Sequence, residues 1–217
     1  MGLVNELQES AERDDVLTVL RRAKRVSAKL RLQDISDWLD HEQNGYPNEV
    51  QVPSYRNIAV TICYNTNGYI PAGYGMLKRG IIPLEGFSDD LTLPVEQSIG
   101  TVATWISDLK TNEGALYIKV SPEMQSLIRS GVQSDLPEIL RQVTFLARLN
   151  DSQIRNIPEQ VKNKILDWAC TLESKGVTGN EQSFSDQEKQ VAQTVIFNIN
   201  NSSIDQLNSS GNNLKEK

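Results

Sequence analysis

The chain has 217 residues and a formal net charge of −6, and this length can bury a sizeable core without a disulfide or a metal. One histidine and two distant cysteines are too few for a typical zinc site, and the acidic balance disfavours nucleic-acid binding over the whole surface. With no segment apolar enough for a signal peptide or a membrane span, we expect a cytoplasmic protein that needs no cofactor, no metal and no membrane partner.

The first 46 residues predict a helical part that contains a helical hairpin. Apolar residues recur every three or four positions in residues 3–12 and again from 16 to 30, where Asp14 or Asp15 supplies the N-cap. A third helix is predicted over residues 35–44, with Asp34 as its cap and Gly45 as its stop. Between residues 20 and 31 the second helix carries only basic charges: Arg21, Arg22, Lys24, Arg25, Lys29 and Arg31.

The middle of the chain predicts a few strands separated by helices and loops. Residues 47–56 should be extended, because Pro47 and Pro53 disfavour helix in the residue before each. The predicted strands are 57–65, 115–121 and 141–150, and 66–80 reads as a glycine-rich loop. One helix should run from Pro94 to near Lys110, and another from Pro122 to Gly131. Cys63 and Cys170 lie in apolar surroundings and should be free and buried.

Two further helices are predicted towards the C-terminus. Residues 158–175 carry one apolar face, and Gly176 should end that helix. Ser185 and Glu188 match a capping box for a helix through Ala192. The whole pattern predicts an α+β fold, mostly helical, with a small antiparallel or mixed sheet.

The segment from residue 195 to 217 differs in composition from the rest and is rich in Asn and Ser. Val195, Phe197 and Ile199 alternate with Ile196, Asn198 and Asn200, which is typical of a short strand. A strand here could pair with another copy or with a protein partner, so the segment is a candidate for homo-oligomer formation. We therefore expect one domain over residues 1–194, followed by a C-terminal strand and tail.

The stretch WLDHEQNGYPNEVQVPSYR, residues 38–56, predicts a corner closed by an ion pair. Arg56 should fold back and bind the carboxylate of Glu42, while Tyr46 and Tyr55 pack their rings and keep their hydroxyls in water. The alternative is a cradle for an anionic ligand, built from Arg56 and the basic helix. His41 is adjacent to Glu42 on the helix and points about 100° away from it, so we expect a surface histidine rather than an acid–base pair.

The basic face of the second helix also has two interpretations. Its charges could pair with acids of this acidic protein, or they could bind RNA, DNA or an acidic protein. Nucleic-acid binding through residues 20–31 is the less favoured of these. The candidate binding residues are therefore Arg56, Glu42, Tyr46, Tyr55, Arg21, Arg25 and Lys29, and no catalytic residue is assigned.

Three blocks in order resemble the AbiTii family, named for an abortive-infection protein of phage defence. The first is the N-terminal LVNELQESAERDDVLTVLRRAKRVSAKL. The second is carried by Trp38, Glu42, Asn44, Gly45, Tyr46, Pro53, Tyr55 and Arg56. The third is VKNKILDWACTLESKGVTGNEQSFSDQEKQVA. The resemblance implies bacterial antiphage defence and assigns no catalytic residue; residues 65–115 carry no part of it.

The residues and the resemblance together leave three hypotheses. The favoured one is a defence protein that acts by binding a phage or host macromolecule. The second is an effector enzyme acting on nucleic acid or a nucleotide, with Glu42 and Arg56 as its polar centre. The third is an oligomerising structural adaptor of a defence system.

Overall fold

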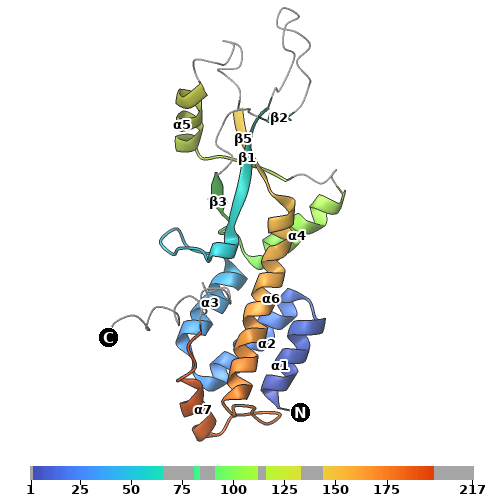
Figure 1. Cartoon of the computed structure of the whole chain (residues 1–217), viewed down its shortest axis with the longest axis vertical. Helices are drawn as coiled ribbons and strands as arrows, with labels where there is room; N and C mark the ends of the chain where they lie inside the picture. The colour runs from blue at the N-terminus through green and yellow to red at the C-terminus, as the bar shows by residue number, and fades with distance from the viewer. Residues whose placement is uncertain (1, 66–80, 84–90, 112–115, 133–143, 198–217) are drawn as a thin grey trace, which may run out of the picture. The chain divides into compact units, whose positions relative to one another are not determined.

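The computed structural model describes residues 2–65, 81–83, 91–111, 116–132 and 144–197 (Figure 1). Contacts divide the chain into two compact units. The first, here called the helical unit, comprises Met1–Arg56, Glu96–Ala103 and Asn156–Lys217. The second, the sheet unit, comprises Asn57–Val95 and Thr104–Arg155. The expected single domain over residues 1–194 stays a prediction.

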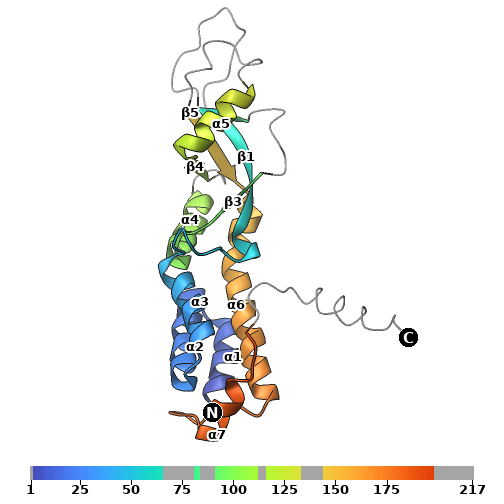
Figure 2. The same cartoon turned by 90° about the vertical axis from the view of Figure 1, so that its left-hand side faces the viewer.

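The helical unit begins with three helices, α1 (Leu3–Arg13), α2 (Val16–Leu30) and α3 (Gln33–Asn44). Helix α2 packs against both of its neighbours, and each helix buries the apolar stripe that its sequence shows (Figure 2). The side chain of Asp15 accepts hydrogen bonds from the backbone N–H groups of Leu17 (3.0 Å) and Thr18 (3.1 Å), which starts α2. The predicted N-terminal helical part is confirmed.

The two ends of α3 show one error of the sequence prediction and one success. The helix begins at Gln33, after Leu32 as N-cap, so the assignment of Asp34 as the cap is wrong. It ends at Gly45 as predicted, with φ at +99°. A Cβ atom there would lie 3.0 Å from the carbonyl oxygen of Glu96, so both the backbone angle and the close approach require glycine.

Helix α2 ends in a left-handed residue that is not glycine. Arg31 has φ 60° and ψ 44°, and the next N–H, of Leu32, donates to the carbonyl of Ser27 at 3.1 Å. This bond closes the helix end in the manner of a Schellman motif, in which glycine is the usual left-handed residue. Arg31 therefore adopts a left-handed backbone conformation, which costs free energy in a residue that has a Cβ atom.

The C-terminal half of the helical unit contains most of α6 (Asp151–Ser174) and all of α7 (Asp186–Ala192). One face of α6 is buried, and Gln8 of α1 donates a hydrogen bond to Glu173 at 2.9 Å. The predicted start at Pro158 is wrong, because α6 begins at Asp151 and Pro158 lies inside it. The capping box of Ser185 and Glu188 is confirmed.

The carboxylate of Glu188 organises the turn between α6 and α7. It accepts hydrogen bonds from the backbone N–H groups of Thr178 (3.0 Å), Gly179 (2.7 Å) and Ser185 (2.8 Å), and from the Ser185 hydroxyl (2.8 Å). Thr178 in turn accepts the N–H of Val4, at the start of α1. Partial burial raises the pKa of Glu188, but these donors outweigh it and bring the pKa down to about 2.

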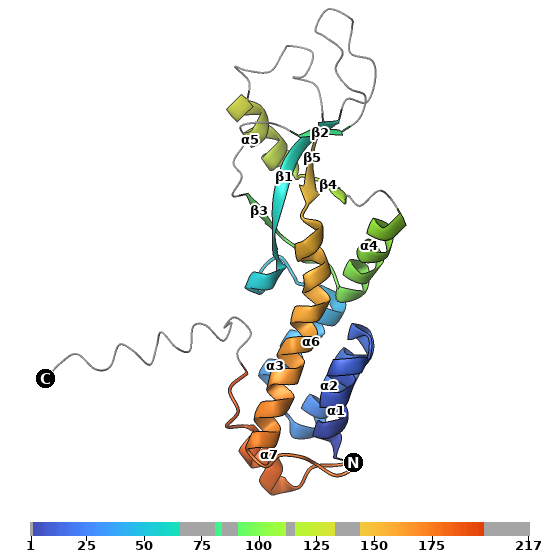
Figure 3. The same cartoon turned by 45° about the vertical axis from the view of Figure 1, so that its right-hand side comes forward.

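The sheet unit is built on a five-stranded sheet of order β2-β1-β5-β4, with β3 paired to β1. Its strands are β1 (Asn57–Asn65), β2 (Ile81–Pro83), β3 (Thr92–Pro94), β4 (Tyr117–Lys119) and β5 (Thr144–Leu149). All the pairings are antiparallel, and β5 leads into α6 (Figure 3). Together with the helices this confirms the α+β fold.

Helix α5 (Pro122–Val132) packs on β5 at Phe145. The side-chain amide of Gln125 donates to the carbonyl of Phe145 at 2.7 Å and accepts its N–H at 3.0 Å, so Gln125 takes the hydrogen bonds that a neighbouring strand would otherwise make. In the pairing of β1 with β5, Tyr64 lies opposite Phe145 and Ile62 opposite Ala147, and all four side chains are buried.

Several boundaries in the sheet unit differ from the sequence prediction. Pro94 ends β3 instead of opening a helix, and α4 (Ile99–Thr111) begins five residues later. Gly131 lies within α5 and does not end it. The three-residue strands β2 and β3 carry no recognisable alternation and were not predicted. The predicted loop 66–80 lies outside the described residues.

Both cysteines are free, as expected, but only Cys63 is buried and Cys170 is exposed. At the C-terminus, Val195, Ile196 and Phe197 form no strand, so that part of the predicted strand is wrong. The remainder of the predicted strand and tail, from residue 198, lies outside the described residues. Among the helices the structure describes, none is long and apolar enough to cross a membrane.

We expect Arg31→Gly to raise the free energy of unfolding by about 0.5–1 kcal/mol, because glycine adopts φ 60° without a steric penalty. The matched control is Arg31→Ala, which removes the same side chain and retains the penalty. Urea denaturation of the three proteins measures the difference. A gain with alanine equal to that with glycine would assign the effect to the arginine side chain instead of the backbone.

We expect Glu188→Gln to lower the free energy of unfolding by about 1–3 kcal/mol at neutral pH, since hydrogen bonds to a partly buried charge are lost. The pKa of Glu188 falls from the ordinary 4.5 to about 2 on folding, so the contribution is complete above 4.5. It should disappear as the pH falls towards 2, and the variant and wild type should then converge. Glu12→Gln, at an exposed position, is the control and should follow the wild type at every pH.

Candidate functional site

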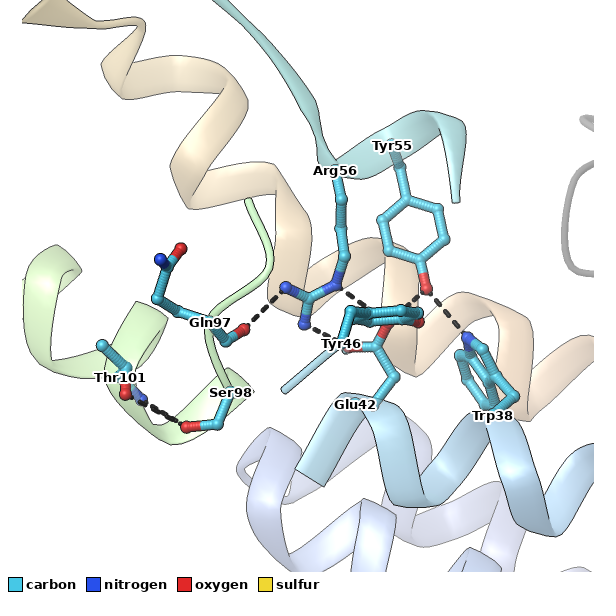
Figure 4. A network of polar contacts seen from close by, with 8 residues as sticks. All are labelled: Trp38, Glu42, Tyr46, Tyr55, Arg56, Gln97, Ser98 and Thr101. Carbon is cyan, nitrogen blue, oxygen red and sulfur yellow. Dashed lines mark hydrogen bonds and ion pairs between the residues drawn. The ribbon is translucent and has the colours of Figure 1, made fainter. Parts of the chain in front are cut away.

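The corner predicted from residues 38–56 is present in the helical unit and is shown in Figure 4. Glu42 lies in the last turn of α3, and Arg56 ends a short 3-10 turn, η1 (Ser54–Arg56). Gly45 reverses the chain between them, which lets the side chains of both residues meet. We call Glu42, Tyr46, Tyr55, Arg56 and Trp38 the Glu42 cluster.

The guanidinium of Arg56 binds the carboxylate of Glu42 with two hydrogen bonds. Nε donates to Oε1 at 3.0 Å and Nη2 donates to Oε2 at 2.5 Å, and both side chains have 0% exposure. Nη1 donates to the backbone carbonyl of Gln97 at 2.9 Å. The predicted fold-back of Arg56 onto Glu42 is therefore confirmed, in the bidentate geometry that arginine favours.

The two tyrosines complete the coordination of the same carboxylate. The hydroxyls of Tyr46 and Tyr55 each donate to Glu42 Oε1 at 2.7 Å, so the expectation that they stay in water is wrong. The indole N–H of Trp38 donates to the Tyr55 hydroxyl at 3.1 Å. The Arg56 guanidinium also lies 5.1 Å from the centre of the Tyr46 ring, within the range of a cation–π contact.

The ionisation of the cluster is fixed by burial and by the charge of Glu42. Burial, and then the Glu42 carboxylate, raise the pKa of both Tyr46 and Tyr55 far above the ordinary value, so both phenols stay neutral. Burial alone would lower the pKa of Arg56, but the hydrogen bonds and charge of Glu42 raise it overall. The arrangement therefore suits a permanent ion pair that ties α3 to η1.

A hollow of about 550 Å³ lies beside the cluster and is lined by Asn44–Pro47, Glu96–Ser98 and Thr101. Part of this lining is the start of α4, where the N–H of Thr101 donates to the Ser98 hydroxyl at 3.2 Å (Figure 4). Among these lining residues Glu96 is the one with a carboxyl group. Among the described residues no group of three or more His, Cys, Asp and Glu could hold a metal ion.

The predicted site residues on α2 lie apart from the cluster. Arg21 and Arg25 are exposed, and no hydrogen bond or ion pair joins either to another described residue. Their neighbours are engaged: Arg22 lies 3.5 Å from Asp14, Lys24 pairs with Asp40, and the Lys29 ammonium donates to the carbonyl of Gln182. Because Arg56 is fully buried, it forms no common surface with Arg21 and Arg25.

A family model, AbiTii, matches residues 2–197 of the chain. The chain belongs to the AbiTii family. Membership implies a role in abortive-infection defence against phage, as the sequence blocks predicted. Searches of curated proteins and of solved structures found no match.

Two residues that take part in the hydrogen bonds of the Glu42 cluster, Trp38 and Gln97, were not predicted as site residues. Trp38 is 2% exposed, and its position in the predicted helix gives no indication of a partner for its N–H. Gln97 takes part through its backbone carbonyl, so its residue type gives no indication that it binds Arg56. His41 is half-buried beside Tyr46, with ring centres 5.3 Å apart, and does not contribute to the hydrogen bonds of the cluster.

We expect Arg56→Ala to lower the free energy of unfolding by about 3–5 kcal/mol, because Glu42 would then be a buried charge without its counter-ion. The control is Lys24→Ala, which breaks the surface pair with Asp40 and should cost at most about 1 kcal/mol. Urea denaturation measures both. The double variant Glu42→Gln, Arg56→Ala should lose about 1–3 kcal/mol less than the sum of the losses in the two single variants. A loss equal to that sum would show that the pair is not coupled.

Proposed function

We propose that this AbiTii protein defends the cell by binding an acidic phage or host protein in the cytoplasm, and that Arg21 and Arg25 form its docking surface. The observation that carries the proposal is the exposure of these two arginines without a partner among the described residues. An exposed arginine that no acid of its own chain binds is available for a carboxylate of another protein.

The spacing of the two arginines supports a defined contact. Arg21 and Arg25 are four residues apart, so both project from the same face of α2 about one helical turn from each other. The helix beneath them is firmly held, since Val19, Leu20 and Ala23 are buried. A rigid support keeps both guanidinium groups in position before a partner arrives, which reduces the entropy lost on binding.

The chemistry of the partner follows from charge. A nucleic acid would have to overcome the net charge of −6, and its affinity depends on many phosphate contacts at once. Two arginines that have no partner among the described residues are few for that purpose, but two bidentate pairs are sufficient to orient a protein with an acidic surface. We therefore favour an acidic protein over RNA or DNA.

The Glu42 cluster supports the same conclusion, because its charged groups are not available for recognition. Its carboxylate and guanidinium are fully buried and bound to each other, so they are committed to folding. These two residues of the second family-like block thereby account for stability, and recognition is left to exposed residues such as Arg21 and Arg25 of the first block. Binding is favoured over catalysis on this argument.

The test is phage yield in cells that express Arg21→Glu, Arg25→Glu. We expect yield to rise to the level of cells without the protein, while thermal melting stays within a few degrees of wild type. The control is Arg13→Glu, Lys175→Glu, which makes the same charge change at exposed positions of the same unit. Protection that survives in the first variant contradicts the proposal, and so does loss of protection in both. Retention of the wild-type protein, but not of the Arg21→Glu, Arg25→Glu variant, on RNA or DNA beads would show that the partner is a nucleic acid instead of a protein.

A further inference from the structure

The last residues that the structure describes lie against α3 of the same unit. After α7 the chain turns back (Figure 1). The ring of Phe197 packs on the ring of Trp38, with centres 5.0 Å apart and planes at 52°. This tilted geometry and distance are those of a favourable aromatic pair. Residues 195–197 therefore cover Trp38 and account for part of its burial.

The segment is held in the way that a bound peptide is held. Ile196 is 88% exposed, whereas Val195 and Phe197 on either side are half-buried, and Phe197 contacts Trp38 of α3. The N–H of Val195 bonds to the carbonyl of Ala192 at 3.0 Å. No backbone hydrogen bond joins Ile196 or Phe197 to another residue in the described part of the chain. Side-chain burial, chiefly of Phe197, thus fixes the segment in place.

The surface beneath Phe197 is preorganised by the Glu42 cluster. The indole N–H of Trp38 is fixed on the Tyr55 hydroxyl at 3.1 Å, and that hydroxyl is fixed on Glu42 at 2.7 Å. The indole ring therefore keeps one orientation whether or not Phe197 covers it. A fixed aromatic surface binds an incoming ring at a lower entropic cost than a mobile one.

We propose that Trp38 is the centre of a peptide-binding site, which the chain's own Val195–Phe197 segment occupies in the resting protein. The ligand that fits is an extended segment of a partner protein with an aliphatic residue two positions before an aromatic one, as Val195 and Phe197 are spaced. Because Phe197 is tethered, its effective concentration at Trp38 is high, so a free peptide competes poorly. A partner would displace it when other contacts hold that partner nearby. This inference is independent of the surface formed by Arg21 and Arg25.

The test uses a fluorescent peptide of the sequence QVAQTVIFNIN, residues 190–200, and the full-length protein. Its anisotropy should report saturable binding to the Phe197→Ala protein with an affinity at least about tenfold higher than to wild type, because the tethered competitor is weakened. The matched control is Ile196→Ala, which truncates the exposed neighbour and should behave as wild type. A peptide that carries Phe197→Ala should bind none of the three proteins.

Two results would overturn the proposal. One is the absence of saturable binding to a Phe197→Ala protein that melts like wild type. If that variant melts early, the same measurement is made on full-length Phe197→Leu, which keeps an apolar side chain but loses the ring. The other is wild-type protein that sediments as a dimer while Phe197→Ala is monomeric. The segment would then be exchanged between copies and would not cover Trp38 of its own chain.

Discussion

The buried carboxylate of Glu42 is the constraint on which the helical unit depends. Removing a charge from water is costly unless a counter-charge and hydrogen bonds surround it, and Glu42 is 0% exposed. Arg56 supplies the charge, and the hydroxyls of Tyr46 and Tyr55 supply further donors. Any backbone path that left one of these groups away from Glu42 would be disfavoured, so the cluster selects the path of the chain from α3 to β1.

The same requirement extends beyond the corner through shared hydrogen-bond partners. Arg56 has further N–H donors after it binds Glu42, and one on Nη1 donates to the carbonyl of Gln97, just before α4. Tyr55 accepts the N–H of Trp38, and Trp38 meets Phe197 near the end of the described chain. Segments distant in sequence are thereby held to one ion pair. Polar contacts specify which segments meet here, whereas apolar burial supplies most of the free energy.

Sequence patterns predicted the features that depend on local chemistry or on strong charge pairing. The cap at Asp15, the stop at Gly45, the capping box of Ser185 and the pairing of Arg56 with Glu42 all follow from what those side chains require. Features that depend on contacts between segments distant in sequence could not be predicted from these patterns. Strand β3 exists because β1 lies beside it, and Pro94 at its end resembles a helix start when viewed alone. The sequence prediction left the two tyrosine hydroxyls in water, because their burial requires three segments of the chain to meet at one carboxylate.

The division between buried and exposed charge determines how function in this family member can be tested. Glu42, Tyr46, Tyr55 and Arg56 belong to the second family-like block, and the structure accounts for each through the stability of one corner. Loss of defence after substitution at these positions would report unfolding as readily as lost recognition. Arg21 and Arg25 on α2, and Phe197 on Trp38, can be altered without removing the counter-ion of a buried charge. A substitution at those positions that abolishes defence while the protein still melts normally would therefore identify recognition itself.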